Sequence, residues 1–343
     1  MSRPFHPRKL LLPLVPAYRL ALWLRERRLG TNLEPVLHLR FPVVSIGNLS
    51  TGGAGKTPLT IALAKALERR GMHVNVLSRG YGRQGQIPVL VAPAGAAEEF
   101  GDEPLLVARE AGVPVYVARL RYEAGLLAEG DAITVAALDE RLKPIVNLLD
   151  DGFQHRQLSR DVDILLLDRQ DWQDSLLPAG NLREPLRAAR RASVIAIPAD
   201  DSELEKEIKA WGWEGPVWRV QRTMEVPSLN GPVAAFCGIA RPQQFFAGLE
   251  AAGLRLAART AFPDHHRYTS ADVERLLAGA HSAAATALLT TQKDLVRLGK
   301  LSSAFPDTMP LKAVPLIVEI EHQDEAIRWL IKRLNLSPPH SSV

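Results

Sequence analysis

Short apolar runs alternate with amphipathic stretches along residues 43–197. The runs are rich in β-branched residues and too short for buried helices, so they predict strands. They span residues 43–46, 73–78, 113–117, 145–149, 163–168 and 194–197. Between them, stretches such as 60–70, 102–111 and 120–129 place apolar residues at helical spacing. The alternation predicts an α/β fold with a mostly parallel sheet and helices on both faces.

The pattern changes after Trp211. Residues 211–232, with three tryptophans among glycines and prolines, predict a packed connection between two units. The elements expected beyond it are strands at 233–237, 286–290 and 316–320 and helices at 242–252, 270–280 and 323–334. The elements up to residue 320 predict a second, smaller α/β domain, and 323–334 is expected to be a terminal helix.

The N-terminus is apolar, but prolines and Arg19 interrupt residues 10–24. The stretch falls short of the roughly 20 apolar residues that a membrane span needs. Basic residues flank it, and Tyr18 and Trp23 lie within it. A helix lying in the interface of an anionic membrane is the favoured interpretation, and a helix packed on the protein's own core is the alternative.

These patterns divide the chain into five parts. They are an amphipathic membrane-interface helix at 1–28, a larger domain at 29–222, a smaller α/β domain at 223–320, a C-terminal helix at 321–337 and a disordered tail at 338–343.

The most specific motif lies between the strand at 43–46 and a helix expected to begin at Pro58. Its glycines let backbone N–H groups surround phosphate oxygens, Lys56 can reach the outer phosphates, and the Thr57 hydroxyl can bind Mg²⁺. Ser50 stands where the usual motif has glycine. The motif predicts a phosphate-binding loop for ATP with Mg²⁺. The residues assigned to the nucleotide are Asn48, Ser50, Thr51, Gly52, Gly53, Ala54, Gly55, Lys56 and Thr57.

Carboxylates and histidines follow other predicted strands. Asp150 and Asp151 end a buried run, a position that binds Mg²⁺ in enzymes with this loop. Asp102 and Glu103 begin a helix, where they serve either as a helix cap or as a base and a metal contact. His265 and its neighbour His266 can orient or relay for a carboxylate.

The composition restricts the partners. The net charge of +4 favours an anionic partner, whether phosphate, lipid or nucleic acid. A single cysteine, Cys237, indicates a reducing compartment. Arginines near the predicted strand ends form either a solvated basic rim or contacts to an anionic substrate.

Taken together, these motifs resemble the tetraacyldisaccharide 4′-kinase family of lipid A biosynthesis. The resembling segments, all between about residues 42 and 298, are 47–58, 78–82, 101–104, 150–155, 177–185, 262–268 and 290–294. The resemblance implies transfer of the ATP γ-phosphate to the 4′-hydroxyl of a tetraacylated glucosamine disaccharide 1-phosphate. It also implies Mg²⁺ and peripheral attachment to the cytoplasmic face of the bacterial inner membrane.

The resemblance also implies residue roles. Lys56 and Asp102 with His265 are the catalytic group, and Gln154 and His155 lie near the nucleotide. Metal contacts come from Thr57, Glu103, Asp150 and Asp151, and the candidates for the lipid headgroup are Arg79, Tyr81, Arg121 and Arg183. We expect a monomer that binds the lipid A disaccharide precursor and an anionic membrane surface, and no nucleic acid.

The chain departs from the family pattern at Asn181, where proline is usual, and at Gln292, where glutamate is usual. We expect the first to loosen a turn, and we give Gln292 no catalytic role. The main rival is a membrane-partitioning ATPase with a deviant phosphate loop, although its signature lysine is here Thr51. A non-enzymatic membrane adaptor with a relic nucleotide site is the third interpretation.

Overall fold

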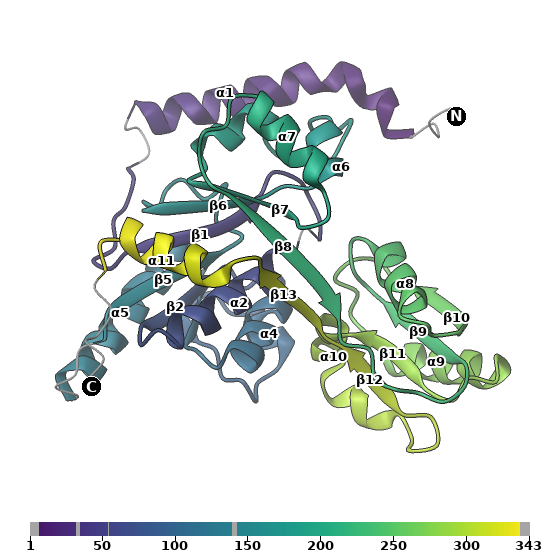
Figure 1. Cartoon of the computed structure of the whole chain (residues 1–343). Coiled ribbons are helices and arrows are strands. Elements are labelled where there is room, and N and C mark those ends of the chain that lie inside the picture. The colour runs from purple at the N-terminus through teal and green to yellow at the C-terminus, as the bar shows by residue number, and fades with distance from the viewer. Residues whose placement is uncertain (1–6, 32–34, 54, 139–142, 337–343) are drawn as a thin grey trace.

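The structure is a computed structural model and describes residues 7–31, 35–53, 55–138 and 143–336. Within these residues nine strands form the larger sheet, in the order β13-β8-β7-β6-β1-β5-β2-β4-β3 (Figure 1). The strands are β1 (Val43–Asn48), β2 (His73–Ser78), β3 (Val89–Leu90), β4 (Val115–Val117), β5 (Ile145–Asp150), β6 (Val162–Leu166), β7 (Val194–Pro198), β8 (Val217–Met224) and β13 (Leu316–Ile320). Only the edge pairs β13–β8 and β3–β4 are antiparallel. The predicted α/β class is confirmed.

Helices cover both faces of this sheet because its central strands are apolar on both sides. One core joins the sheet to α2 (Lys56–Glu68), α4 (Asp102–Ala111) and α11 (Gln323–Arg333). On the opposite face lie α5 (Arg121–Leu138), the 3₁₀ helix η2 (Leu186–Arg191) and α7 (Ser202–Ala210). The short helices α3 (Ala97–Phe100) and α6 (Arg169–Gln173) complete this unit. The parallel strands β1, β5 and β6 end at the same edge of the sheet.

A smaller unit carries a parallel sheet of four strands within the described residues, ordered β10-β9-β11-β12. Its elements are β9 (Val233–Cys237), α8 (Pro242–Ala251), β10 (Leu256–Ala261), α9 (Ser270–Ser282), β11 (Leu288–Thr291), α10 (Gln292–Leu298), η3 (Gly299–Ala304) and β12 (Leu311–Val314). Figure 1 shows this unit beside the carboxyl ends of the large sheet.

Two sequence-based expectations differ from the structure here. Residues 217–224 form β8, although the whole segment 211–232 was expected to be a connection. The strand at 316–320 was assigned to the smaller domain, but it is β13 and pairs antiparallel with β8 in the larger sheet. The physical reason is that Pro315 separates β12 from β13, so the chain passes from one sheet directly into the other. The units are therefore joined by two adjacent strands.

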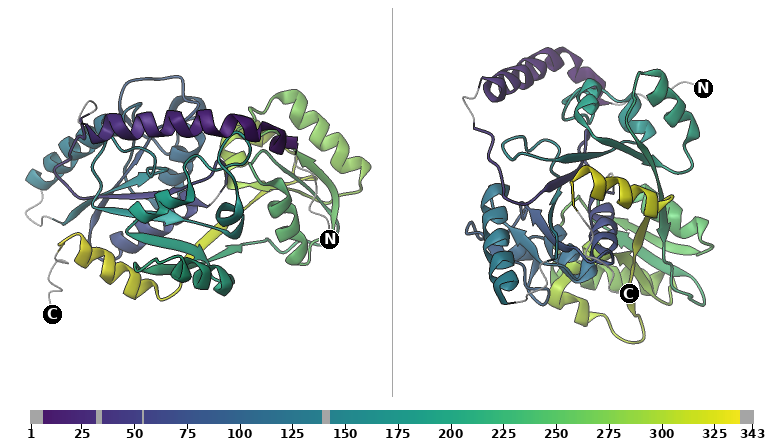
Figure 2. Two further views of the ribbon diagram at one scale, coloured as in Figure 1. Left: turned by 90° about the horizontal axis from the view of Figure 1, so that it is seen from above. Right: turned by 60° about the vertical axis from the view of Figure 1, so that its left-hand side comes forward.

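The N-terminal segment forms η1 (Pro7–Leu14) and α1 (Val15–Gly30). Figure 2 shows α1 as a long rod along one side of the larger unit. Val15, Tyr18 and Leu22, at helical spacing, pack on the core that contains η2 and α7. No helix in the described ranges is long and apolar enough to cross a membrane.

Candidate functional site

The phosphate-binding loop connects β1 to α2. Gly52 and Gly55 have φ angles of 104° and 83°, a backbone region that glycine adopts without steric cost. The helix begins at Lys56 and not at Pro58, because Gly55 takes the cap position. Pro58 then lies in the first turn, where a backbone N–H has no partner within the helix. Ala54 of the predicted nucleotide site lies outside the described residues.

Lys56 is held at the start of α2 by two other predicted site residues. Its Nζ donates to Asn48 Oδ1 at 2.9 Å and lies 3.5 Å from Asp151 Oδ1. Arg183 also donates to Asn48 Oδ1, at 2.6 Å, and forms a bidentate pair with Asp151. Burial raises the pKa of the Asp151 carboxyl, but Lys56 and Arg183 outweigh it and hold that pKa well below its usual range. Two cations are thus concentrated beside the loop.

Asp150 and Thr57 form the position that suits Mg²⁺. Thr57 Oγ1 lies 3.4 Å from Asp150 Oδ2, and Thr60 donates to Asp150 Oδ1 at 3.0 Å. Burial and the charges of Glu103 and Asp151 raise the pKa of Asp150 to about 6. A divalent cation would relieve this repulsion. No cluster of three metal-ligating side chains occurs among the described residues, but Mg²⁺ commonly takes one or two carboxylates and completes its shell with water and phosphate. These residues therefore fit the ion.

Asp102 lies at the first residue of α4 and meets the smaller unit. Its Oδ2 is 3.0 Å from Nδ1 of His265 and 2.6 Å from Nε of Arg297. Burial raises the pKa of the Asp102 carboxyl, but the hydrogen bond from His265 and the charge of Arg297 hold it well below its usual range. The same hydrogen bond raises the pKa of His265. The contact expected between Asp102 and His265 is present, and Asp102 is the ionised partner.

His266 points elsewhere. Its Nε2 lies 3.1 Å from Asp272 Oδ2, inside the capping box of α9. The geometry therefore selects His265 as the histidine that contacts Asp102.

Glu103, the next residue of α4, pairs with Lys293 at 2.5 Å, and this cation lowers the pKa of Glu103.

The other predicted site residues surround the Asp150–Asp151 turn. Gln154 donates to the Asn48 carbonyl at 2.8 Å, and Arg121 donates to the carbonyl of Asp151 at 3.0 Å. Burial, followed by the charges of Arg121 and neighbouring arginines, lowers the pKa of His155 to about 4. Arg79 is exposed and is one of those neighbouring charges.

Tyr81 is also exposed, and its ring lies 5.2 Å from that of His265. The predicted nucleotide, metal and headgroup residues therefore converge on one edge of the sheet.

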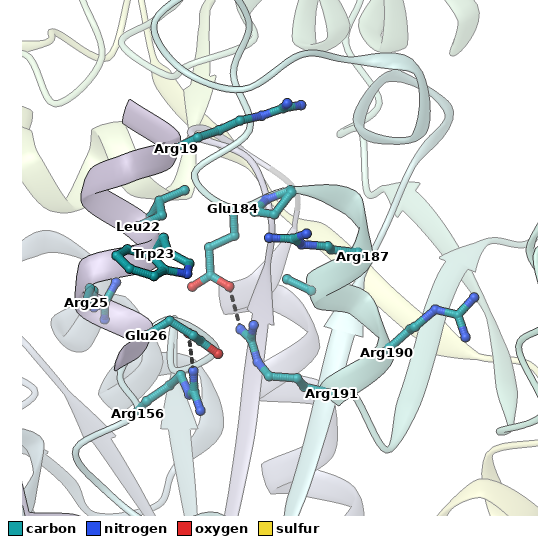
Figure 3. A pocket seen from close by; sticks show the side chains of 12 residues that line it. Arg19, Leu22, Trp23, Arg25, Glu26, Arg156, Glu184, Arg187, Arg190 and Arg191 are labelled. Atoms are coloured by element: carbon teal, nitrogen blue, oxygen red, sulfur yellow. Dashed lines mark hydrogen bonds and ion pairs between the residues drawn. The ribbon is translucent and has the colours of Figure 1, made fainter. Parts of the chain in front are cut away.

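A cavity of about 570 Å³ opens between α1 and η2 (Figure 3). Arginines predominate in its lining, and they are Arg19, Arg25, Arg156, Arg187, Arg190 and Arg191. Figure 3 shows two ion pairs, Arg156–Glu26 and Arg191–Glu184. Arg19 and Arg187 have neither an ion pair nor a hydrogen bond among the described residues. The cavity therefore offers unpaired positive charge next to the apolar Leu22 and Trp23.

The outer face of the N-terminal segment exposes large apolar side chains beside charged ones. The apolar ones are Leu10, Leu11, Leu12, Leu14, Leu20, Trp23 and Leu24, and Arg19, Arg25, Arg27 and Arg28 are exposed as well. The opposite face packs on the protein, as the second sequence-based interpretation expected. Contact of the outer face with a membrane stays a prediction.

Comparison with known proteins identifies the family. The family model described as tetraacyldisaccharide-1-P 4′-kinase matches residues 7–335. The chain belongs to this kinase family. A tetraacyldisaccharide 4′-kinase of Koribacter versatilis is 41% identical over 93% of this chain and 97% of its own. One of Gluconacetobacter diazotrophicus is 43% identical over 85% of each.

A solved structure of the same family is also similar. LpxK from Aquifex aeolicus, in complex with ATP, has a TM-score of 0.71 and 32% identity. The alignment covers 96% of this chain and 99% of that protein.

Asn181, which stands where the family usually has proline, is held by hydrogen bonds on its side chain and its backbone. The Asn181 side chain donates to Asp174 Oδ2 at 2.9 Å and accepts from Arg8 at 2.6 Å, and its carbonyl accepts from the N–H of Thr51. These hydrogen bonds restrain the backbone of the turn, which a proline ring would do by fixing φ. Gln292 donates to Glu110 on α4 at 2.8 Å.

Sequence reasoning missed Arg297 and Lys293, which reach Asp102 and Glu103 from the smaller unit. Lys293 lies inside residues 290–294, a segment that resembles the kinase family, so the sequence could have indicated it as a site residue. Arg297 is four residues further along α10, on the same face, and only the spacing of a helix could have pointed to it.

Proposed function

We propose that the chain transfers the γ-phosphate of ATP to the 4′-hydroxyl of a tetraacylated glucosamine disaccharide 1-phosphate, in lipid A biosynthesis. The observation that carries this proposal is that two features lie together at one edge of the sheet. One is the phosphate loop with Lys56 and Thr57, and the other is a buried carboxylate, Asp102, bonded to His265. A loop that only hydrolyses ATP has no need of a base for an alcohol.

In this proposal Asp102 is the base. The 4′-hydroxyl loses its proton to the Asp102 carboxylate as its oxygen forms a bond to the γ-phosphorus. The bond from that phosphorus to the β–γ bridging oxygen breaks, and ADP leaves. His265 orients Asp102, and Lys56 leaves its contacts with Asn48 and Asp151 to meet the charge on the phosphates.

Mg²⁺ would be held by Thr57 and Asp150, with Glu103 and Asp151 near it. When bound, it neutralises charge on the phosphate oxygens. The chain's own part is to keep Asp150 buried and oriented, which the hydrogen bond from Thr60 supports.

The acceptor is proposed to bind between the phosphate loop and α1. Arg79, Tyr81, Arg121 and Arg183 are the candidates for its headgroup. The arginine-lined cavity next to α1 supports this placement, because an anionic headgroup with apolar chains matches unpaired guanidinium groups beside Leu22 and Trp23.

The protein is proposed to act as a monomer attached peripherally to the cytoplasmic face of the inner membrane. The exposed leucines of η1 and α1, with arginines near them, support attachment to an anionic surface. A substrate embedded in a bilayer would then meet the site at the interface.

The deciding experiment is mass spectrometry of the disaccharide lipid incubated with the protein, Mg²⁺ and ATP. We expect a product with one added phosphate, and no product from an otherwise identical 4′-deoxy lipid. ATP hydrolysis stimulated by lipid vesicles, without a phosphorylated lipid, would instead favour the membrane-partitioning ATPase.

A second prediction concerns the outer face of α1. Replacing Leu20 and Leu24 with serine removes exposed apolar surface but leaves Val15, Tyr18 and Leu22 packed on the core. We expect weaker co-sedimentation with anionic vesicles by about 10-fold or more, given roughly 1 kcal/mol or more for each buried leucine. ATP binding should not change.

The matched control is serine at Leu126, an exposed leucine on α5. Equal vesicle binding by wild type and the double variant would contradict membrane contact through this face.

A further inference from the structure

We propose that Arg297 is a positioning residue for phosphoryl transfer, which holds the Asp102 carboxylate from the smaller unit in the orientation that accepts the proton of the acceptor. This inference rests on the proposed kinase reaction and adds a residue to it. Arg297 touches Asp102 and is not placed against the substrate.

The contact is direct and buried. Nε and Nη2 of Arg297 both lie 2.6 Å from Asp102 Oδ2. The two side chains are 6% and 7% exposed, so water screens this pair far less than an ion pair on the surface. His265 Nδ1 reaches the same oxygen at 3.0 Å. Oδ1 accepts from the backbone N–H of Glu103. The carboxylate is therefore fixed at both oxygens.

Arg297 is itself held in place by the smaller unit. Its Nη1 donates to Asp294 Oδ1 at 3.1 Å and also to the Gly238 carbonyl. Asp294 is fully buried and accepts further bonds from Tyr268, Thr291 and the N–H of Gly238. A guanidinium is planar and rigid, so anchoring one nitrogen fixes the direction of the others. The position of Asp102 is thus set by the core of the other unit.

Arg297 also lowers the basicity of Asp102. A cation on Oδ2 favours the ionised carboxylate and so weakens its pull on a proton. In phosphoryl transfer, catalysis comes almost entirely from positioning and electrostatic stabilisation, with little covalent chemistry for the protein to do. Loss of orientation is then the larger effect, because a misplacement of about 1 Å can lower a rate by about 10²-fold.

A purely mechanical role is the competing explanation. Gln292 and Lys293 on the same helix also bridge to α4, through Glu110 and Glu103. If Arg297 only clamps the units together, its loss should resemble the loss of such a bridge. If it positions Asp102, its effect must vanish when Asp102 is absent.

The test is a double-mutant cycle with Arg297→Met and Asp102→Ala, measured as kcat and as KM for ATP on the disaccharide lipid. We expect Arg297→Met alone to lower kcat by about 10–100-fold, with KM for ATP changed less than about threefold. In the Asp102→Ala background the same substitution should change kcat less than about threefold, because residues that act as a unit are not additive.

Two further variants keep the result decisive. Arg297→Lys retains a cation that reaches one oxygen but loses the fork, so its kcat should lie between wild type and Arg297→Met. Gln292→Ala removes a bridge between the units without touching Asp102 and should keep kcat near wild type. Thermal unfolding of each variant shows whether it is folded, and if Arg297→Met is not, the cycle is run with Arg297→Lys.

Additive losses in the cycle, or wild-type kcat in folded Arg297→Met, would overturn the positioning role. A loss in Gln292→Ala as large as that in Arg297→Met would also overturn it, in favour of a clamp. Failure of the underlying reaction looks different, because wild type itself would then form no phosphorylated lipid.

Discussion

Replacing Asp102 with alanine is expected to lower kcat by about 10²–10⁴-fold, the range found for loss of a general base. The carboxylate is ionised, buried, and fixed by His265 and Arg297, so no neighbouring group takes its place. Glu103, the adjacent carboxylate, is paired with Lys293. The loss should appear in kcat, measured with saturating ATP and lipid, while ATP affinity by calorimetry stays near wild type.

The matched control is Asp102→Asn. An amide can still accept from Arg297 and His265 through its oxygen but cannot take a proton, so its kcat should fall nearly as far as in the alanine variant. Alanine removes a partner from buried Arg297, which keeps Asp294 and the Gly238 carbonyl. Wild-type kcat in a folded Asp102→Asn variant would rule out proton acceptance by Asp102.

Most of the fold could be predicted because the buried strands appear in the sequence as short, uninterrupted apolar runs. The run at 145–149 is apolar without interruption and became the fully buried β5. β8 could not be found in this way. It lies next to the edge of the sheet, so its polar residues Arg219 and Gln221 alternate with buried Trp218 and Val220 among glycine and proline signals. A strand with one solvated face carries a weaker pattern than a strand buried on both.

The contacts of the site also differ in how far the sequence predicts them. Contacts within one strand-end segment, such as Lys56 with Asn48, follow from a local motif. Contacts between the units do not, because Asp102 and Arg297 are 195 residues apart and meet only where α4 of one unit packs against α10 of the other. The N-terminal helix was ambiguous for a further reason. It has apolar residues on two faces, one packed on the core and one exposed, and its sequence does not say which face is which.

Replacing Lys56 with methionine is expected to lower kcat/KM for ATP by about 10²–10³-fold, the typical cost of removing one donor aimed at developing negative charge. Methionine is unbranched and apolar and only one atom shorter than lysine, but it supplies no charge to the phosphates. The fold should survive, because Asp151 keeps its bidentate pair with Arg183, and Asn48 keeps its bond from the same arginine.

The control is Lys65→Met, on the exposed face of the same helix, which should bind ATP and turn over as wild type does. Calorimetry with Mg-ATP separates the two possible outcomes for Lys56. Weaker ATP binding together with lower kcat means that Lys56 meets the phosphates both before and during transfer, whereas unchanged binding with lower kcat confines its contact to the transition state. Unchanged kcat/KM in folded Lys56→Met would contradict a phosphate contact altogether. It would leave the lysine as a structural partner of Asn48 and Asp151, which its ammonium group contacts among the described residues.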